Sequence, residues 1–186
     1  ITINGGTVTE NGDVGIRLAS CSVIKISKTD INNNKKSGIG VESLKKELTI
    51  DNAAINGNGD YGVNINASKN VAVTENTTIS ANKNCGIRIA GSEEVSVKNA
   101  VISKNAKSGI AVTSSKKITI SDATVNNNGT DSRDYGINLN GVDTATVTNV
   151  TASSNSSHGL LITTSKGINV SGSTFNTSAG GYGIYC

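Results

Sequence analysis

Apolar and polar residues alternate over short stretches that return at a nearly fixed interval along the whole chain. The first alternation follows a glycine, as in Gly86-Ile87-Arg88-Ile89. Its eight copies begin at Gly15, Gly38, Gly62, Gly86, Gly109, Gly136, Gly159 and Gly183, separated by 23, 24, 24, 23, 27, 23 and 24 residues. Self-similarity at a fixed period is typical of a repeat architecture. Alternation over so few residues predicts short strands with one buried face.

Each repeat carries two further apolar features. A second alternation occupies residues 24–26, 48–50, 71–73, 95–97, 118–120, 145–147 and 168–170. A single apolar position follows it, in the column Val8, Ile31, Ile55, Ile79, Ile102, Val125, Ala152 and Phe175. One repeat therefore predicts a strand, a corner, a second strand, a corner, a brief third strand and a return.

Stacking such repeats predicts a single all-β domain over residues 1–186, a right-handed parallel β-helix of about eight coils of roughly 24 residues. The predicted handedness follows from the strong preference of parallel crossover connections. A helical fold does not fit, because no apolar stripe repeats at three and four residues and Ile, Val, Thr, Asn, Ser and Gly dominate. A leucine-rich repeat, which shares the period, requires more than the six leucines present.

The corners account for the remaining pattern. An asparagine follows the third strand in seven repeats, at Asn11, Asn34, Asn58, Asn82, Asn105, Asn128 and Asn155, with Ser178 in the last repeat. Asn tolerates left-handed backbone and bonds neighbouring backbone groups, so the column predicts a stacked ladder at a tight turn. The repeat glycine predicts either positive φ or close backbone approach. A small polar column, Ser68, Ser92, Ser115 and Ser165, marks the corner after the first strand.

Composition and charge narrow the classes of function. Hydrophobic residues make up 35% of the chain, with no Trp, no Met and one Phe, which is little for a globular core but enough for a solenoid. The net charge of +3 is small and the 17 Lys and Arg are scattered, which argues against a nucleic-acid partner. No apolar run approaches the roughly 18 residues of a membrane span, and no signal peptide is recognisable. The three cysteines fall in different columns, which argues against an internal disulfide.

The recurring phrase of the form N-x-x-x-G-I-x-V resembles the right-handed β-helix repeats of the pectin-lyase-like superfamily, of the carbohydrate-binding and sugar-hydrolase type. The resemblance covers nearly the whole chain. It implies polysaccharide lyases, glycoside hydrolases, epimerases, phage tailspikes, adhesins and non-catalytic surface proteins as relatives. Its motifs specify the fold and leave the chemistry open.

Aligned repeats show no catalytic carboxylates at the predicted outward positions of the first two strands. The first strand presents Arg17, Gly40, Asn64, Arg88, Ala111, Asn138, Leu161 and Tyr185, and the second presents Thr2, Lys25, Thr49, Ala72, Ser96, Thr119, Thr146 and Asn169. A glycoside hydrolase needs two carboxylates around one bond, and a calcium-dependent lyase needs acidic ligands. We therefore expect neither a metal nor a cofactor.

The sixth repeat is the most irregular, because four extra residues lengthen its return at residues 129–135. The column before the repeat glycine predicts that Tyr135, His158 and Tyr182 stack beside this insertion. With Arg133, they form a candidate sugar-binding patch. Asp131 and Asp134 with His158 are the acid–base candidates. An ordinary surface bulge with rings covering a corner is the competing interpretation.

These observations favour a non-catalytic extracellular or cell-surface module, such as a stalk, adhesin or fibre, that contacts glycans along its side. The alternative is a polysaccharide-active lyase, hydrolase or epimerase with its site in the insertion or outside this chain. The chain starts and stops on either side of the same predicted corner without a recognisable cap. Because uncapped solenoids expose strand edges, we expect a fragment of a longer protein or end-to-end self-association.

Overall fold

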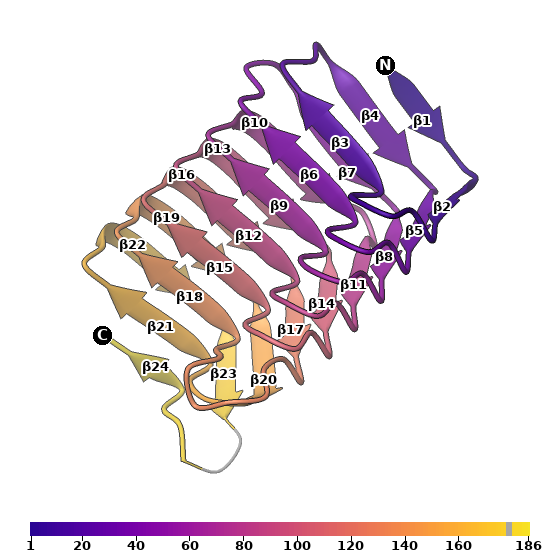
Figure 1. Cartoon of the computed structure of the whole chain (residues 1–186). Coiled ribbons are helices and arrows are strands. Elements are labelled where there is room, and N and C mark those ends of the chain that lie inside the picture. The colour runs from indigo at the N-terminus through magenta and orange to yellow at the C-terminus, as the bar shows by residue number, and fades with distance from the viewer. Residues whose placement is uncertain (178–179) are drawn as a thin grey trace.

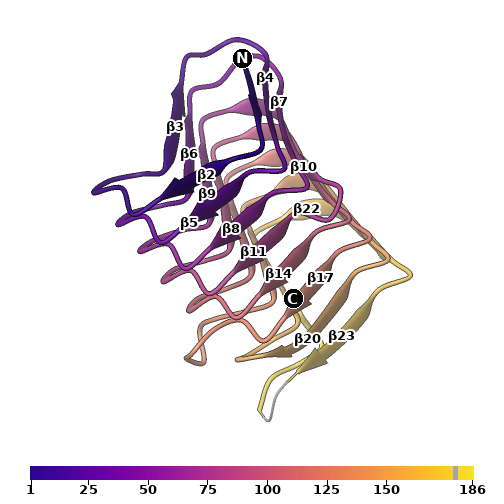
Figure 2. The same ribbon diagram turned by 90° about the vertical axis from the view of Figure 1, so that its right-hand side faces the viewer.

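A computed structural model describes residues 1–177 and 180–186. In these residues the chain winds through 24 short strands and no helix, and the strands form three parallel sheets that stack coil upon coil (Figures 1 and 2). The predicted β-helix of about eight coils is confirmed. Ser178, the predicted last member of the asparagine column, lies outside the described residues.

Each coil contributes one strand to each sheet. Sheet A contains β1 (Thr2–Asn4), β4 (Ile24–Ser27), β7 (Leu48–Asp51), β10 (Lys69–Thr74), β13 (Glu93–Lys98), β16 (Lys116–Ser121), β19 (Asp143–Thr148) and β22 (Lys166–Ser171). Sheet B contains β2 (Thr7–Thr9), β5 (Asp30–Asn32), β8 (Ala54–Asn56), β11 (Thr78–Ser80), β14 (Val101–Ser103), β17 (Thr124–Asn126), β20 (Thr151–Asn155) and β23 (Thr174–Thr177). Sheet C contains β3 (Ile16–Ala19), β6 (Ile39–Glu42), β9 (Val63–Asn66), β12 (Ile87–Ala90), β15 (Ile110–Thr113), β18 (Ile137–Asn140), β21 (Leu160–Thr163) and β24 (Ile184–Tyr185).

The register places equivalent residues of successive coils over one another. Ile87 pairs with Val63 on one side and with Ile110 on the other. The Val63 N–H donates to the Gly86 carbonyl at 2.9 Å, so the repeat glycines are vertical neighbours as the period predicts. The inward Ile, Val and Leu side chains are buried in one continuous column. Full burial of each such side chain contributes roughly 1.5–3 kcal/mol, which stabilises the stack without large aromatic residues.

The asparagine column forms the predicted ladder between sheets B and C. Each side-chain amide donates to the carboxamide oxygen of the next asparagine, at 2.7–3.1 Å, from Asn11 through to Asn155. Each backbone N–H donates to the same oxygen at 3.0–3.1 Å. From Asn34 onward the amide also donates to a carbonyl of the preceding coil. The buried amides are thereby satisfied on both sides, as buried polar groups must be.

Of the two predicted reasons for asparagine at this corner, tolerance of left-handed backbone is wrong. The left-handed backbone belongs to the residue before each ladder asparagine, namely Glu10, Asn33, Gly57, Ala81, Lys104, Asn127 and Ser154, with φ between 54° and 65°. The ladder asparagines themselves are selected for their amides. The repeat glycines are likewise absent from the residues with positive φ, so close backbone approach is the correct one of the two predicted reasons.

The serine column shapes the corner between sheets C and A. The Ser92 hydroxyl accepts from the Ser68 N–H at 3.1 Å, and the Ser115 hydroxyl accepts from the Ser92 N–H at 3.1 Å. Each hydroxyl donates to a carbonyl two residues earlier in its own coil. Serine is therefore present because it replaces a missing backbone acceptor at this turn.

Candidate functional site

Aromatic rings gather at the C-terminal end of sheet C, on the corner that enters it. His158 stacks on Tyr135, with ring centroids 5.4 Å apart and planes 17° apart, and on Tyr185 at 5.0 Å and 11°. Tyr182 lies 5.4 Å from His158 and 5.6 Å from Tyr185. The three predicted rings are thus together, and Tyr185 joins them from the outward face of β24. We call these four residues the aromatic stack.

Backbone contacts hold the stack in place. The Tyr182 N–H donates to Nδ1 of His158 at 3.0 Å, which leaves Nε2 as the proton-bearing nitrogen of the neutral ring. The N–H groups of Gly136 and Gly159 donate to the carbonyls of His158 and Tyr182 in the next coil, at 3.0 and 3.1 Å. Tyr182 is 61% exposed and Tyr185 is 47% exposed. The stack is therefore an ordered apolar surface that is open to solvent.

Hydrogen bonds within the loop hold the insertion of the sixth repeat together. The buried Asp134 carboxylate accepts the N–H groups of Thr130 and Asp131, both at 3.1 Å, and lies 3.6 Å from the Lys107 ammonium. The Asp131 carboxylate accepts the Arg133 N–H at 2.7 Å. Both carboxylates thus serve the loop as hydrogen-bond acceptors.

The candidate acid–base group is not assembled. In residues 1–177 and 180–186, no hydrogen bond or ion pair joins Asp131 or Asp134 to His158, whose Nδ1 is occupied by Tyr182. No group of three His, Cys, Asp or Glu side chains suited to a metal ion occurs in that part of the chain either. The structure brings the aromatic candidates together and leaves the carboxylate candidates in the loop.

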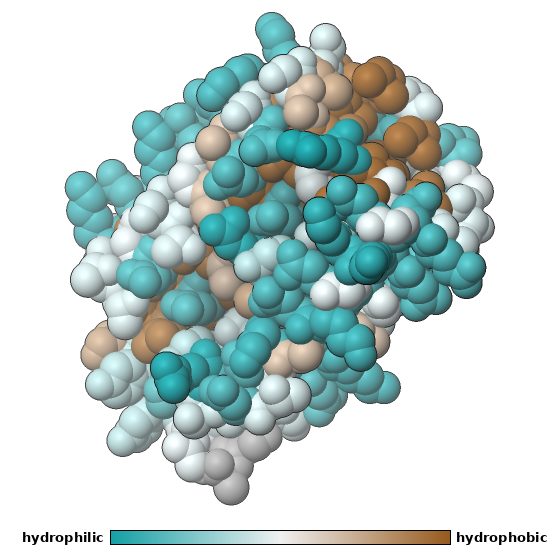
Figure 3. All heavy atoms as spheres, viewed as in Figure 1, coloured by the Kyte–Doolittle hydropathy of each residue, from teal (hydrophilic) through white to brown (hydrophobic). Residues whose placement is uncertain are grey.

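Basic residues line the N-terminal half of the same face. A groove of about 290 Å³ is lined by residues that include Arg17, Asn64 and Arg88. Arg88 donates to the Asn64 side chain at 3.0 Å and lies over the Tyr61 ring at 5.7 Å, while Arg17 pairs with Glu42 at 2.9 Å. Figure 3, which has the view of Figure 1 with sheet C toward the reader, shows a mainly hydrophilic surface over this sheet. Sheet C thus carries hydrogen-bond donors at one end and rings at the other.

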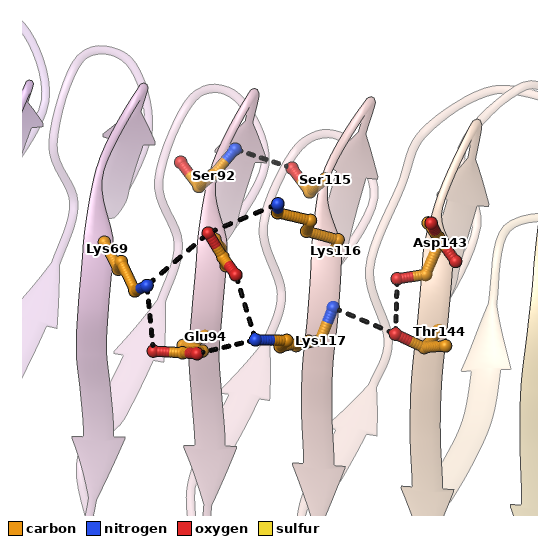
Figure 4. A network of polar contacts seen from close by, with 9 residues as sticks. Lys69, Ser92, Glu94, Ser115, Lys116, Lys117, Asp143 and Thr144 are labelled. Carbon is orange, nitrogen blue, oxygen red and sulfur yellow. Dashed lines mark hydrogen bonds and ion pairs between the residues drawn. The ribbon is translucent and has the colours of Figure 1, made fainter.

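Sheet A carries a charged column that the alignment of outward positions missed. This column consists of register partners on successive coils, so their charges alternate along the axis: Lys69, Glu93, Lys116, Asp143 and Lys166. Figure 4 labels Lys69, Lys116 and Asp143. From β10 onward the sheet A strands begin two residues before the apolar pair, whereas the predicted strands began at that pair. The signal was present in the sequence, because these five residues recur with the spacing of the repeat.

The family model described as "Right handed beta helix region" matches residues 1–133. The chain belongs to this right-handed β-helix family. No curated protein matches its sequence.

Solved structures share the fold of this β-helix at low identity. The A-module of mannuronan C-5 epimerase AlgE6 from Azotobacter vinelandii matches with a TM-score of 0.90 and 18% identity, over 99% of this chain and 54% of that one. The A-module of AlgE4 from the same organism matches with a TM-score of 0.80 and 15% identity, over 100% and 58%. PfbA, a surface adhesin of Streptococcus pneumoniae, matches with a TM-score of 0.66 and 15% identity, over 97% and 62%. The chain spans little more than half the length of these proteins, and the likeness shows the fold alone.

The three cysteines of this β-helix are free, as their columns predict. Burial raises the pKa of the Cys85 thiol to about 11, with the nearby Asp134 charge adding to the effect. Because the thiolate is the reactive form, Cys85 should resist alkylation at pH 8 and react faster only as the pH approaches 11. Cys186 is exposed and serves as the internal control in a mass-spectrometric time course with iodoacetamide. Equal labelling of Cys85 and Cys186 at pH 8 would contradict this prediction.

No helix in residues 1–177 or 180–186 has the length and apolar character that crossing a membrane requires.

Proposed function

We propose that this chain is a non-catalytic β-helix module of the extracellular space or cell surface that binds glycans along the outer face of sheet C. The observation that carries the proposal is the aromatic stack, whose rings are ordered by one another and by backbone hydrogen bonds while Tyr182 and Tyr185 remain open to solvent. Sugar rings bind such surfaces through apolar stacking, with hydroxyls bonded to polar groups at the edge.

The rest of sheet C supports an extended ligand. The strands of this sheet repeat at about 4.8 Å, so a polymer chain lying along the axis would meet one coil after another. From the aromatic stack it would pass toward Asn64, Arg88 and Arg17, which line the groove at the other end of the face. These side chains donate hydrogen bonds to hydroxyl and carboxylate oxygens alike.

The names of similar structures are compatible with this proposal. They include mannuronan C-5 epimerases, a periplasmic alginate epimerase, a pectate lyase, a surface adhesin and a phage tailspike protein. Both enzymes and adhesins occur among them, so the choice between catalysis and binding rests on this chain's own residues. Asp131 and Asp134 are engaged by the insertion loop and Lys107, which favours binding without catalysis.

Glycan-array binding tests the proposal. The wild-type chain should bind a subset of polysaccharides, and Tyr182→Ala with Tyr185→Ala should weaken that binding at least about tenfold, because each lost aromatic contact is worth roughly 1 kcal/mol. Thr119→Ala, on the outer face of sheet A, is the control and should leave glycan binding unchanged. Absence of any hit above background for the wild-type chain would end the proposal.

The enzymatic alternative has its own readout. Wild-type protein should leave every bound polysaccharide intact when the products are separated by size and analysed for epimerised sugars. Breakdown or epimerisation by the wild-type chain that disappears in the combined variant Asp131→Asn, Asp134→Asn and His158→Gln would replace the binding proposal with catalysis.

A further inference from the structure

Four successive residues of the charged column on sheet A are self-complementary: the same charges read in the opposite direction place each positive residue opposite a negative one. We call Lys69, Glu93, Lys116 and Asp143 the charge comb. They begin β10, β13, β16 and β19 and are register partners in that order, so their charges alternate at the strand spacing of about 4.8 Å. Figure 4 shows Lys69, Lys116 and Asp143 on neighbouring strands of the sheet.

Neighbouring charges of the comb form ion pairs within the chain but remain partly exposed to solvent. The Glu93 carboxylate lies 3.6 Å from the Lys69 ammonium and 3.4 Å from that of Lys116. The side chains of Lys69, Lys116 and Asp143 are nevertheless 42%, 55% and 53% exposed. Ion pairs this open contribute little to folding, so the comb retains its capacity to attract a charged partner.

A second charged row accompanies the comb. Lys117 lies 2.9 Å from Glu94 and 3.0 Å from Glu93. Contact with these carboxylates raises the pKa of the Lys117 ammonium, and contact with Lys117 lowers the pKa of both carboxyls. All three groups therefore carry their charges at neutral pH. The pattern of positive and negative positions on this face is a fixed property of the molecule.

The outward side chains in the centre of the sheet, beside the comb, are short. Ala72, Ser96, Thr119 and Thr146 are register partners in the centre of the face. Beside the comb, at the corner between sheets C and A, a groove of about 460 Å³ is lined by residues that include Ser92, Ser115 and Gly141. A second flat face can approach such a surface closely, and the groove leaves room for long lysine side chains.

We propose that the outer face of sheet A is an interface for a second copy of this chain, with the two solenoid axes antiparallel. A two-fold axis along the strand direction, placed between β13 and β16, sets Glu93 opposite Lys116 of the second copy and Lys69 opposite its Asp143. Symmetry repeats each pair, as an isologous interface requires. The same operation sets Glu94 opposite Lys117 and Ser96 opposite Thr119, so no side chain in the centre faces a like charge.

The spacing of the charges along the comb identifies the partner as a second copy of this chain. Opposite charges must recur at the strand spacing of about 4.8 Å along the whole comb, and another β-helix has that period by construction. Overlap of the four strands β10, β13, β16 and β19, each about 20 Å long, buries on the order of 400 Å² per copy. This is less than the roughly 800 Å² per partner of a stable complex, so we expect a weak dimer that high salt dissociates.

Charge exchange tests the interface. Sedimentation equilibrium of the wild-type chain should show a monomer–dimer equilibrium that weakens at least tenfold between 50 mM and 500 mM NaCl. The acidic variant (Lys69→Glu with Lys116→Glu) and the basic variant (Glu93→Lys with Asp143→Lys) should each be monomeric, because each now faces its own sign. An equimolar mixture of the two should form a 1:1 heterodimer at least as tight as the wild-type dimer.

The controls separate this inference from folding, from end-to-end stacking and from glycan binding. Asp13→Lys with Lys36→Glu exchanges an exposed ion pair elsewhere and should leave dimerisation unchanged. Circular dichroism establishes that each variant folds, and glycan binding by the aromatic stack should survive in the acidic and the basic variant. A wild-type chain that stays monomeric at low salt, variants that fail to pair when mixed, or rods longer than one chain in electron micrographs would overturn the proposal.

Discussion

Asn82→Ala is expected to lower the free energy of unfolding by about 3–5 kcal/mol. The side-chain amide of Asn82 donates to the Ile55 carbonyl at 3.1 Å and to the Asn105 oxygen at 2.9 Å. Its oxygen accepts the N–H and the amide of Asn58, both at 3.0 Å. Alanine removes these four bonds from a buried layer and leaves the Asn58 N–H without its acceptor, and each unsatisfied buried group costs about 1–3 kcal/mol.

Urea denaturation followed by circular dichroism measures the loss, and Asn169→Ala is the matched control. Asn169 is an exposed asparagine on the outer face of β22, so its replacement should change the stability by less than about 0.5 kcal/mol. For a chain of this length, the ladder variant should also melt roughly 10 °C earlier. A loss below about 1 kcal/mol would show that the ladder is not a major source of stability.

The position of Asn82 makes this loss more than local. Coils of a solenoid contact only their neighbours, so the stability is a sum of coil and interface contributions. A break between the coils of Asn58 and Asn105 weakens the coupling of the two halves of the stack. Unfolding of the variant should therefore be less cooperative than that of the wild-type chain, which is visible as a lower urea m-value.

Much of the fold could be predicted from the sequence because one coil is short and is repeated eight times. The inward Ile and Val positions and the ladder asparagines recur in register, so the internal repetition reveals the stacking that a single coil would not. Stacking of Tyr135, His158 and Tyr182 was predicted on the same basis and is confirmed. Their role in binding a glycan stays a prediction.

Other features depend on information that the repeat does not contain. Asp131 and Asp134 lie in an insertion without an equivalent in other coils, so only coordinates show that their oxygens accept backbone N–H groups. The left-handed corner residues include Glu10, Ala81 and Lys104, which are residue types that do not predict positive φ. Tertiary stacking imposes that backbone on whatever residue precedes the ladder asparagine. The repeat glycines differ from these residues, because their recurrence is clear from the sequence. The sequence does not decide, however, whether positive φ or close backbone approach requires them.

Gly86→Ala tests whether close backbone approach explains the repeat glycines. This variant is expected to destabilise the chain by about 3 kcal/mol or more. A methyl group at Gly86 would lie 2.8 Å from the Gly109 carbonyl oxygen, 2.8 Å from the Asn105 amide nitrogen and 2.5 Å from a methyl carbon of Ile102. The Gly109 oxygen accepts the Ile87 N–H at 2.9 Å, so it cannot move without breaking a sheet bond. Overpacking against atoms that are fixed in this way costs more than the usual 1–3 kcal/mol.

Gly12→Ala is the matched control, because a methyl group at Gly12 meets no atom within 4 Å and its φ is not positive. That variant should be neutral or gain up to about 1 kcal/mol, since alanine restricts the unfolded chain. Equal stability of the Gly86 and Gly12 variants in urea would mean that the coils can separate enough to admit a methyl group. The spacing of the stack would then be set by the sheets alone, and the glycine column would have to be explained by something other than contact between neighbouring coils.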